Sequence, residues 1–523
     1  MLGRQNTHCV VVGTLLPSRQ LAILAAVLLC FELTVPNCAI AQPAKAKNSL
    51  QVAQDLHRKR YREFSNEIKK LADDCDEKGL NDEANEVRSR DFEADFQSFH
   101  VNKLPTEVQS DVSVNANGVE QRIWQKRLRY LETEYAKDLY IQSRAALRHK
   151  LTTHAYNLIR EAALHDPDNE QVRKILGFVR RKNEWVTPFA AKQMNEGKIW
   201  HDKFGWLLKT HVDRYEDGER LFRTQWISAE KEKLRRTDFG SAWEVRTDHY
   251  LIKTNVSLEK GVEMGKALED FYGVFTETFA AFFNTPEQLQ KLFDTPVNNI
   301  RADRWYTVHF YRSREEYIER MRKFFPAIEQ TNGVYLTSDR IAHFYFDPNR
   351  DHEGTLFHEA THQLFYESEK TTRTICDNHH FWIIEGIACY MESFQRNEDG
   401  TFSLGDLSHI RFFGARNNLL RKNYYVPLRE FSGFGMQEFQ LQPEPTLAKN
   451  YTQAAGLARF FMHYDNGRYR EALVKHLTQL YSASSRVRED AESLDELTGI
   501  EFTELDRQYA EDAAEVDTRF TRK

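Results

Sequence analysis

The sequence predicts an α+β protein with a mainly helical N-terminal region. Between residues 50 and 182, apolar side chains recur at helical spacing among many charged ones. Alternating, β-branched segments at 249–256, 305–311 and 333–346 then indicate a small sheet. Helical periodicity dominates from there to about residue 515. Strands that come before a run of helices favour a small mixed sheet followed by a helical half.

Composition narrows the class of protein before any motif is considered. The chain has 523 residues, which predicts several domains, and its 41% hydrophobic and 29% charged residues are typical of a folded chain. A net charge of −6 argues against a nucleic-acid-binding protein that phosphates would attract. No apolar run reaches about 18 residues, so we expect no transmembrane span in the mature chain.

Residues 1–41 have the pattern of a signal peptide. Arg4 and Arg19 precede an apolar run from Leu21 to Phe31, which is too short to span a bilayer. Ala39-Ile40-Ala41 then offers a small-residue cleavage site. We expect cleavage near Ala41 and export to the periplasm or the extracellular space. The alternative is an uncleaved N-terminal anchor.

Residues 42–182 are predicted to be an α-helical region that contains one tetratricopeptide-like helix pair. An alanine-rich helix leads to the turn at Asp166-Pro167, and a second helix follows. No second copy recurs at a fixed period, and stable arrays usually need three or more repeats. The region is therefore either a helical cap on the next domain or a surface that binds a partner protein.

Residues 183–245 are predicted to be a Trp-rich linker module with β-hairpin character. Five tryptophans are spread through them. The segment 204–222 alternates around Asp217-Gly218, a pair that is typical of a hairpin turn. The spacing of the tryptophans indicates packing more than carbohydrate binding.

The strongest chemical signal is the motif H-E-x-x-H at residues 358–362. His358 and His362 are four residues apart on a predicted helix, so both imidazoles can face one metal ion. Glu359 between them can reach a water molecule that the metal has made acidic. A carboxylate in that position can accept the proton as the water attacks a carbonyl group.

A third ligand is expected because a catalytic zinc ion needs three protein ligands and one open position. Glu385 stands in an otherwise apolar helical segment, 23 residues after His362. A lone carboxylate in such a setting needs a partner, since burying it unpaired is costly. A metal ion is the natural partner, and a solvent-facing glutamate on an amphipathic helix is the alternative.

The motif H-E-x-x-H, followed by W-x-x-E-G-x-A-x-Y-x-E at residues 382–392, resembles the gluzincin zinc metallopeptidases, the clan of thermolysin and its related aminopeptidases. The order of motifs is also similar to exported bacterial proteins that carry a peptidase MA-like domain. The resemblance covers about residues 246–515. It implies a gluzincin-like metallopeptidase domain that acts on a peptide or protein substrate. It also implies one Zn2+ per chain bound by His358, His362 and Glu385, with Glu359 as the general base.

The resemblance implies two further features of the site. Tyr451 lies at the start of a predicted helix, where aminopeptidases of the clan place a tyrosine that stabilises the oxyanion. Tyr424 and Tyr425 are the other candidates for this role. The strand 340–346 corresponds to the edge strand with which the clan pairs an extended peptide.

One departure from the clan pattern leaves two functions open. Thermolysin-like enzymes carry an aspartate one turn after the ligand glutamate, and here that position is Cys389. Glu392 is the candidate replacement, and His379 or His380 could supply a substitute ligand. The alternative to an active peptidase is a catalytically weak or inactive gluzincin-fold protein that binds partners through its helical region.

Overall fold

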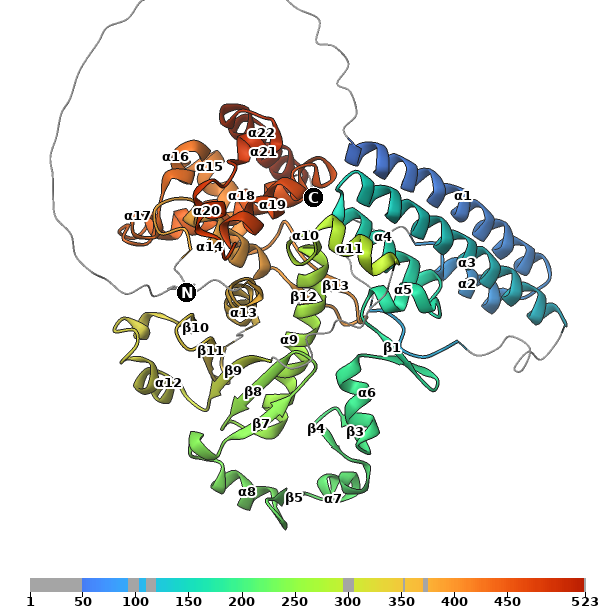
Figure 1. Cartoon of the computed structure of the whole chain (residues 1–523), viewed down its shortest axis with the longest axis horizontal. Coiled ribbons are helices and arrows are strands. Elements are labelled where there is room, and N and C mark those ends of the chain that lie inside the picture. The colour runs from blue at the N-terminus through green and yellow to red at the C-terminus, as the bar shows by residue number, and fades with distance from the viewer. Residues whose placement is uncertain are drawn as a thin grey trace, which may run out of the picture.

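The computed structural model describes six stretches of the chain (Figure 1). They are residues 49–92, 103–109, 119–294, 305–350, 353–369 and 375–521. The expected signal peptide at 1–41 lies outside these described residues. Within them, no helix combines the length and the apolar character that crossing a membrane requires. The architecture is mixed α+β, as the sequence predicts, with one five-stranded sheet and many helices.

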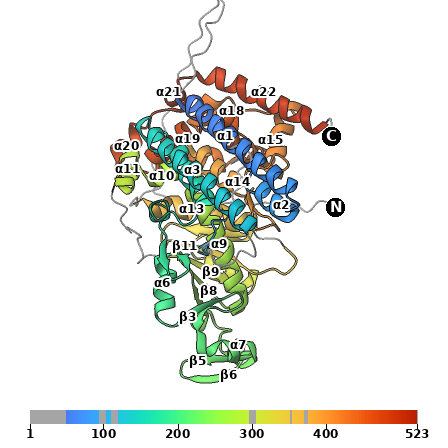
Figure 2. The same cartoon turned by 90° about the vertical axis from the view of Figure 1, so that its right-hand side faces the viewer.

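The N-terminal region is a bundle of helices. They are α1 (Ser49–Glu77), α2 (Asn81–Ser89), α3 (Val119–Arg148), α4 (Thr152–His165) and α5 (Glu170–Ile175). The long helices α1 and α3 run side by side (Figures 1 and 2). A helix from much later in the chain, α11 (Pro286–Asp294), buries Leu289 and Phe293 in the same core. The bundle is thereby tied to the rest of the molecule by packing.

Residues 179–235 contain three short hairpins, each followed by a helix. In chain order the elements are β1 (Val179–Arg181), β2 (Glu184–Val186), α6 (Pro188–Asn195), β3 (Lys198–His201), β4 (Gly205–Leu208), α7 (Val212–Glu216), β5 (Glu219–Phe222), β6 (Gln225–Ser228) and α8 (Ala229–Arg235). The predicted hairpin turn at Asp217-Gly218 is wrong, because this turn joins α7 to β5. Gly218 has φ +84°, and such a glycine ends a helix as readily as it turns a hairpin.

The five-stranded sheet has the order β10-β11-β9-β8-β7. Its strands are β7 (Trp243–Arg246), β8 (Tyr250–Thr254), β9 (Tyr306–Tyr311), β10 (Gly333–Leu336) and β11 (Ile341–Tyr345). The pairs β8–β9 and β9–β11 are parallel, and the two outer pairs are antiparallel.

The prediction that strand 340–346 forms an edge of the sheet is wrong. β11 lies between β9 and β10, and the edges of the sheet are β7 and β10; all four residues of β10 are buried. Alternation along a strand shows which faces its side chains occupy, but it does not show how many neighbours the strand has.

The remaining elements complete the two faces of the sheet and the helical half. They are α9 (Leu258–Thr278), α10 (Ala280–Phe283), α12 (Arg314–Met321), α13 (Glu353–Ser368), α14 (Phe381–Met391), β12 (Gln395–Arg396), β13 (Phe402–Ser403), α15 (Ile410–Arg421), α16 (Leu428–Gly433), α17 (Met436–Gln440), α18 (Thr446–Gly467), α19 (Arg470–Leu480), α20 (Ser485–Glu489), α21 (Leu494–Thr498) and α22 (Phe502–Thr521). α9 and α13 pack on one face of the sheet, and α12 packs on the other. The H-E-x-x-H helix α13 therefore lies between the sheet and α14 (Figure 1).

Candidate metal centre

The helix α13 places the H-E-x-x-H motif in the protein interior. Every side chain from Leu356 to Glu367 is buried, because the sheet covers one side of the helix and α14 covers another. His358 and His362 come from successive turns of this helix, and their rings lie 4.9 Å apart between centroids. The predicted common face of the two imidazoles is therefore present.

The helix α14 brings the third predicted ligand to the same point. Glu385 is fully buried, as are all the residues of α14. The next residue, Gly386, allows α18 to pack very closely: a Cβ atom there would lie 2.6 Å from the carbonyl oxygen of Ala454. Glycine at this position thus allows the close packing of α14 against α18 next to the predicted ligand Glu385.

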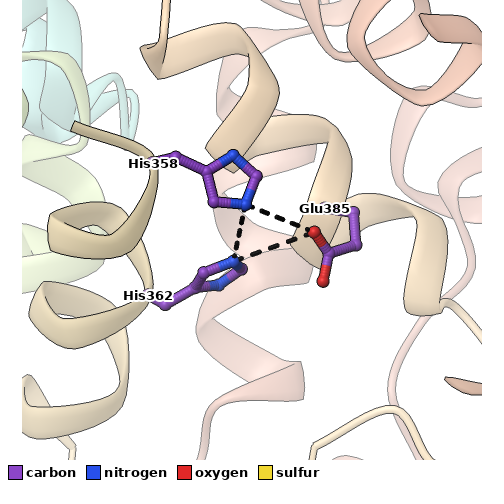
Figure 3. Close-up of side chains that lie close together, drawn as sticks. All are labelled: His358, His362 and Glu385. Carbon is purple, nitrogen blue, oxygen red and sulfur yellow. Dashed lines mark hydrogen bonds and ion pairs between the residues drawn. The ribbon is translucent and has the colours of Figure 1, made fainter. Parts of the chain in front are cut away.

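The ligand atoms of His358, His362 and Glu385 converge on one small space (Figure 3). The two Nε2 atoms are 3.2 Å apart. Glu385 Oε2 lies 3.5 Å from Nε2 of His358 and 3.8 Å from Nε2 of His362. Atoms that bind one tetrahedral ion at about 2.0–2.1 Å are roughly 3.3 Å from one another. The spacing of this group fits a zinc ion.

The buried carboxylate oxygens of Glu385 also favour a bound cation. Both carboxylate oxygens of Glu385 are buried and have no hydrogen-bond partner in the part of the chain that the structure describes. Burial raises the pKa of Glu385, and the neighbouring His358 offsets only part of this effect. Burial and then the His358 ring lower the pKa of His362 well below its ordinary value. A neutral imidazole is the form that binds metal ions, and a cation would compensate the buried carboxylate.

Glu392 contacts the first histidine, as the sequence predicts. Its Oε1 lies 2.8 Å from His358 Nδ1, which leaves Nε2 of that ring to face Glu385. Arg411 on α15 donates two hydrogen bonds of 2.9 Å to the same carboxylate. Burial disfavours ionisation, but the Arg411 charge and the bond to His358 hold the pKa of Glu392 well below its usual range.

A second group of potential ligand atoms lies on the other side of His358. It consists of His358, Cys389 and Glu392, whose ligand atoms lie within 4.8 Å of one another. Arg411 already supplies the positive charge there, since its guanidinium pairs with Glu392. Burial raises the pKa of the Cys389 thiol, which disfavours the thiolate that a metal requires. The group with Glu385 is therefore the better metal site.

We expect Glu392→Gln to weaken zinc binding by about 10- to 100-fold, the usual cost of losing a group that orients a metal ligand. An amide holds the ring N–H less strongly than a carboxylate does, and the change leaves Arg411 without its anionic partner. Competition against a chelator of known affinity measures the effect. Cys389→Ala is the matched control and should change the affinity little. The reverse pattern would assign the orienting role to Cys389.

Glu359 is held by the edge strand of the sheet. Its Oε2 accepts a hydrogen bond of 2.8 Å from the backbone N–H of Tyr335 on β10. The side chain is almost fully buried. A backbone amide leaves no mark in the sequence, so this contact could not be predicted. The hydrogen bond from Tyr335 fixes one carboxylate oxygen of Glu359, the residue predicted to be the general base.

The candidate tyrosines occupy different positions. Tyr451 is buried on α18 and packs edge-to-face on Phe439. The Tyr424 hydroxyl donates to Asn450 Oδ1 at 2.6 Å, and the Tyr425 hydroxyl donates to Asp506 Oδ1 at 2.6 Å. The hydroxyl groups of Tyr424 and Tyr425 are therefore bonded to residues outside the His358–His362–Glu385 group.

His379 and His380 precede α14 and do not belong to the group around Glu385. Arg411 is the supporting residue that sequence reasoning missed. It stands between exposed apolar residues, Ile410 and Phe413, and nothing in that pattern distinguishes an arginine whose side chain is only 13% exposed from one at the surface.

Comparison with protein-family models, with curated proteins and with solved structures finds no match to this chain. The description of the site thus depends on the structure alone, which shows a buried His-His-Glu group within an α+β fold.

Proposed function

We propose that this chain is an exported zinc metallopeptidase of the gluzincin type. The observation that carries the proposal is the buried carboxylate of Glu385, which has no hydrogen-bond partner among the described residues and faces the Nε2 atoms of His358 and His362. These three side chains would bind the zinc ion. The signal-peptide pattern of residues 1–41 supports export.

The proposed chemistry is hydrolysis of a peptide bond. A zinc ion bound here would supply a nucleophilic water near neutral pH and would polarise the carbonyl group of the substrate. Glu359 would accept the proton of the attacking water and pass it to the leaving amine. The hydrogen bond from Tyr335 N–H keeps its carboxylate in one orientation while it does so. Glu392 and Arg411 would keep His358 in the tautomer that presents Nε2.

The experiment that tests the proposal has two measurements on one preparation of the full chain, purified without added metal or chelator. Elemental analysis should find zinc bound through His358, His362 and Glu385, so that His362→Ala loses it. A peptide library read by mass spectrometry should show zinc-dependent cleavage. Bound zinc without cleavage would favour the alternative, a non-catalytic protein that retains the fold. Absence of zinc after titration would reject the metal site.

Tyr451→Phe is expected to lower kcat by roughly 10²-fold, the effect of losing one oxyanion donor. KM and zinc content should stay close to those of the wild type, since the ring and its contact with Phe439 remain. Tyr425→Phe is the control, because its hydroxyl is bonded to Asp506. An unchanged kcat in Tyr451→Phe would remove this residue from the mechanism.

A further inference from the structure

Residues 177–236 contain three copies of one structural unit, which we call unit 1 (177–196), unit 2 (197–217) and unit 3 (218–236). Each unit begins at a glycine with a positive φ, continues as a two-stranded hairpin and ends in a short helix. The second residue of each second strand is a tryptophan, and the tryptophans recur every 20 or 21 residues. The shared residues are Gly177, Gly197, Gly218, Trp185, Trp206 and Trp226. Such a period is typical of repeat architectures, in which each copy is one small folding unit.

In unit 1, an extended segment from elsewhere in the chain adds to the outer edge of the hairpin. The N–H of Trp185 on β2 donates to the carbonyl oxygen of Thr106 at 2.7 Å. The N–H of Val108 donates to the carbonyl oxygen of Asn183 at 2.8 Å, and the pairing is antiparallel. These bonds use main-chain groups, as in strand addition between a protein and a bound peptide. The second strand of a unit can therefore bind an extended segment along its outer edge.

The hairpin of unit 3 has the same local geometry as that of unit 1. Each has a two-residue loop, and the first loop residue has a positive φ, 54° at Lys182 and 56° at Arg223. Unit 2 differs, because its loop has three residues and its second strand β4 packs against β7 of the five-stranded sheet. The comparison with unit 1 therefore applies to unit 3.

The outer edge of β6 in unit 3 has no third strand among the described residues, since β5 and β6 form a two-stranded sheet. Ala229 N–H donates to the carbonyl oxygen of Gly218 at 2.8 Å, which makes these two residues a hydrogen-bonded pair. Such pairs alternate along an antiparallel ladder, so Leu221 and Trp226, three steps further on, do not bond to each other. The N–H of Trp226 thus points away from β5, as that of Trp185 points away from β1. It has no hydrogen-bond partner within the described stretches of the chain.

The surface around β6 is exposed and basic. β5 and β6 lie at the lower end of the molecule in Figure 2, and Gln225 and Ser228 of β6 are exposed. Unit 3 has six lysines and arginines against three glutamates, a net charge of +3. Four of its cations are exposed and form no ion pair in the part of the chain that the structure describes: Arg223, Lys231, Lys233 and Arg235. Such a surface favours a bound segment that carries carboxylates.

We propose that β6 binds an extended, acidic segment of a partner protein as a third, antiparallel strand. The segment occupies the edge of β6 as residues 105–108 of this chain occupy the edge of β2. The N–H of Trp226 donates to a carbonyl oxygen of the segment, and the four exposed cations of unit 3 attract its carboxylates. None of the residues of unit 3 belongs to the His358–His362–Glu385 group, so this docking site does not depend on the proposed peptidase activity.

The test uses the full chain, with chelator present to prevent zinc-dependent cleavage, and a fluorescent peptide of alternating valine and glutamate. Fluorescence anisotropy should show saturable binding, and hydrogen–deuterium exchange should slow at residues 224–228. The same peptide methylated on its backbone nitrogens should bind about tenfold more weakly or worse, because it loses donors to the strand. A peptide of alternating valine and lysine should also bind more weakly, and high salt should reduce the difference between the two peptides.

Variants of the protein test the same contacts from the other side. Trp226→Pro removes the outward N–H and should weaken binding about tenfold, whereas Trp226→Phe keeps it and should bind like the wild type. Lys231→Glu combined with Lys233→Glu changes only exposed side chains and should also weaken binding, with Lys192→Glu in unit 1 as the control.

Three outcomes would overturn the proposal. The first is no binding at about 1 mM acidic peptide, the weak end of measurable affinities. The second is binding that backbone methylation of the peptide and the Lys231→Glu, Lys233→Glu variant leave unchanged. The third is slowed exchange on β10 in place of β6, which would place the peptide beside Glu359 and not on unit 3.

Discussion

Glu359→Gln is expected to reduce peptide hydrolysis by about 10²–10⁴-fold, the usual contribution of a general base, while zinc stays bound. Glutamine has nearly the shape of glutamate and can still accept the hydrogen bond from Tyr335 N–H. It cannot accept a proton from water. The loss should therefore fall on kcat, with KM and zinc content close to those of the wild type.

The control for this variant is Glu367→Gln, which makes the same substitution two turns further along α13. Glu367 is buried like Glu359, and its Oε1 accepts a hydrogen bond from Gln363 Nε2 that a glutamine oxygen can also accept. Its kcat should remain near the wild-type value. If Glu359→Gln retained wild-type turnover, Glu359 would not be the base. If it lost zinc as well, its main role would be structural.

Glu385→Met is expected to have opposite effects on the metal-free and the zinc-loaded protein. Without metal, the buried carboxyl has no hydrogen-bond partner among the described residues, so an apolar side chain of similar length should raise the free energy of unfolding by about 1–3 kcal/mol. With zinc, the wild type gains about 4 kcal/mol when the free ion is at 1,000 times Kd, and the variant should lose most of this gain. Thermal unfolding with zinc and with chelator measures both effects.

Glu277→Gln is the matched control for this reversal. Glu277 is another carboxylate in the helical part of the structure, and it forms an ion pair with Arg160 at 2.6 Å. Removing the charge of Glu277 breaks its ion pair with Arg160 and should lower the free energy of unfolding. The decrease should be the same with and without zinc, because Glu277 does not belong to the candidate metal group. A Glu385→Met variant that is destabilised to the same degree in both conditions would mean that Glu385 has a structural role and binds no metal.

Much of the fold could be predicted because it depends on local patterns. The α+β order, the helical N-terminal region and the helices around residues 358 and 385 follow from periodicity, which reports the face that each element buries. The prediction of a hairpin turn at Asp217-Gly218 was wrong because it also depended on a local pattern alone. A dipeptide that reverses the chain does so equally well after a helix, and the helix α7 was too short for its periodicity to be recognised.

Most residues of the candidate site could be predicted from the sequence. The residues that hold them in place, Tyr335 and Arg411, could not. The positions of His358, Glu359 and His362 follow from the pitch of one helix. Glu385 was predicted because a lone carboxylate in an apolar segment needs a partner. The choice of Glu392 over Cys389 depends on how the end of α14 and the start of α15 meet, since Arg411 completes the pair.

By itself, the sequence determined the residue types of the candidate ligands, their spacing on α13 and the buried setting of Glu385, because side chains four residues apart on a helix are neighbours whatever surrounds them. Only the tertiary structure decided which strand forms the edge and that the amide of Tyr335 holds Glu359. These contacts join segments that are distant in sequence, and the packing of whole elements sets them, so no local period in the sequence reports them.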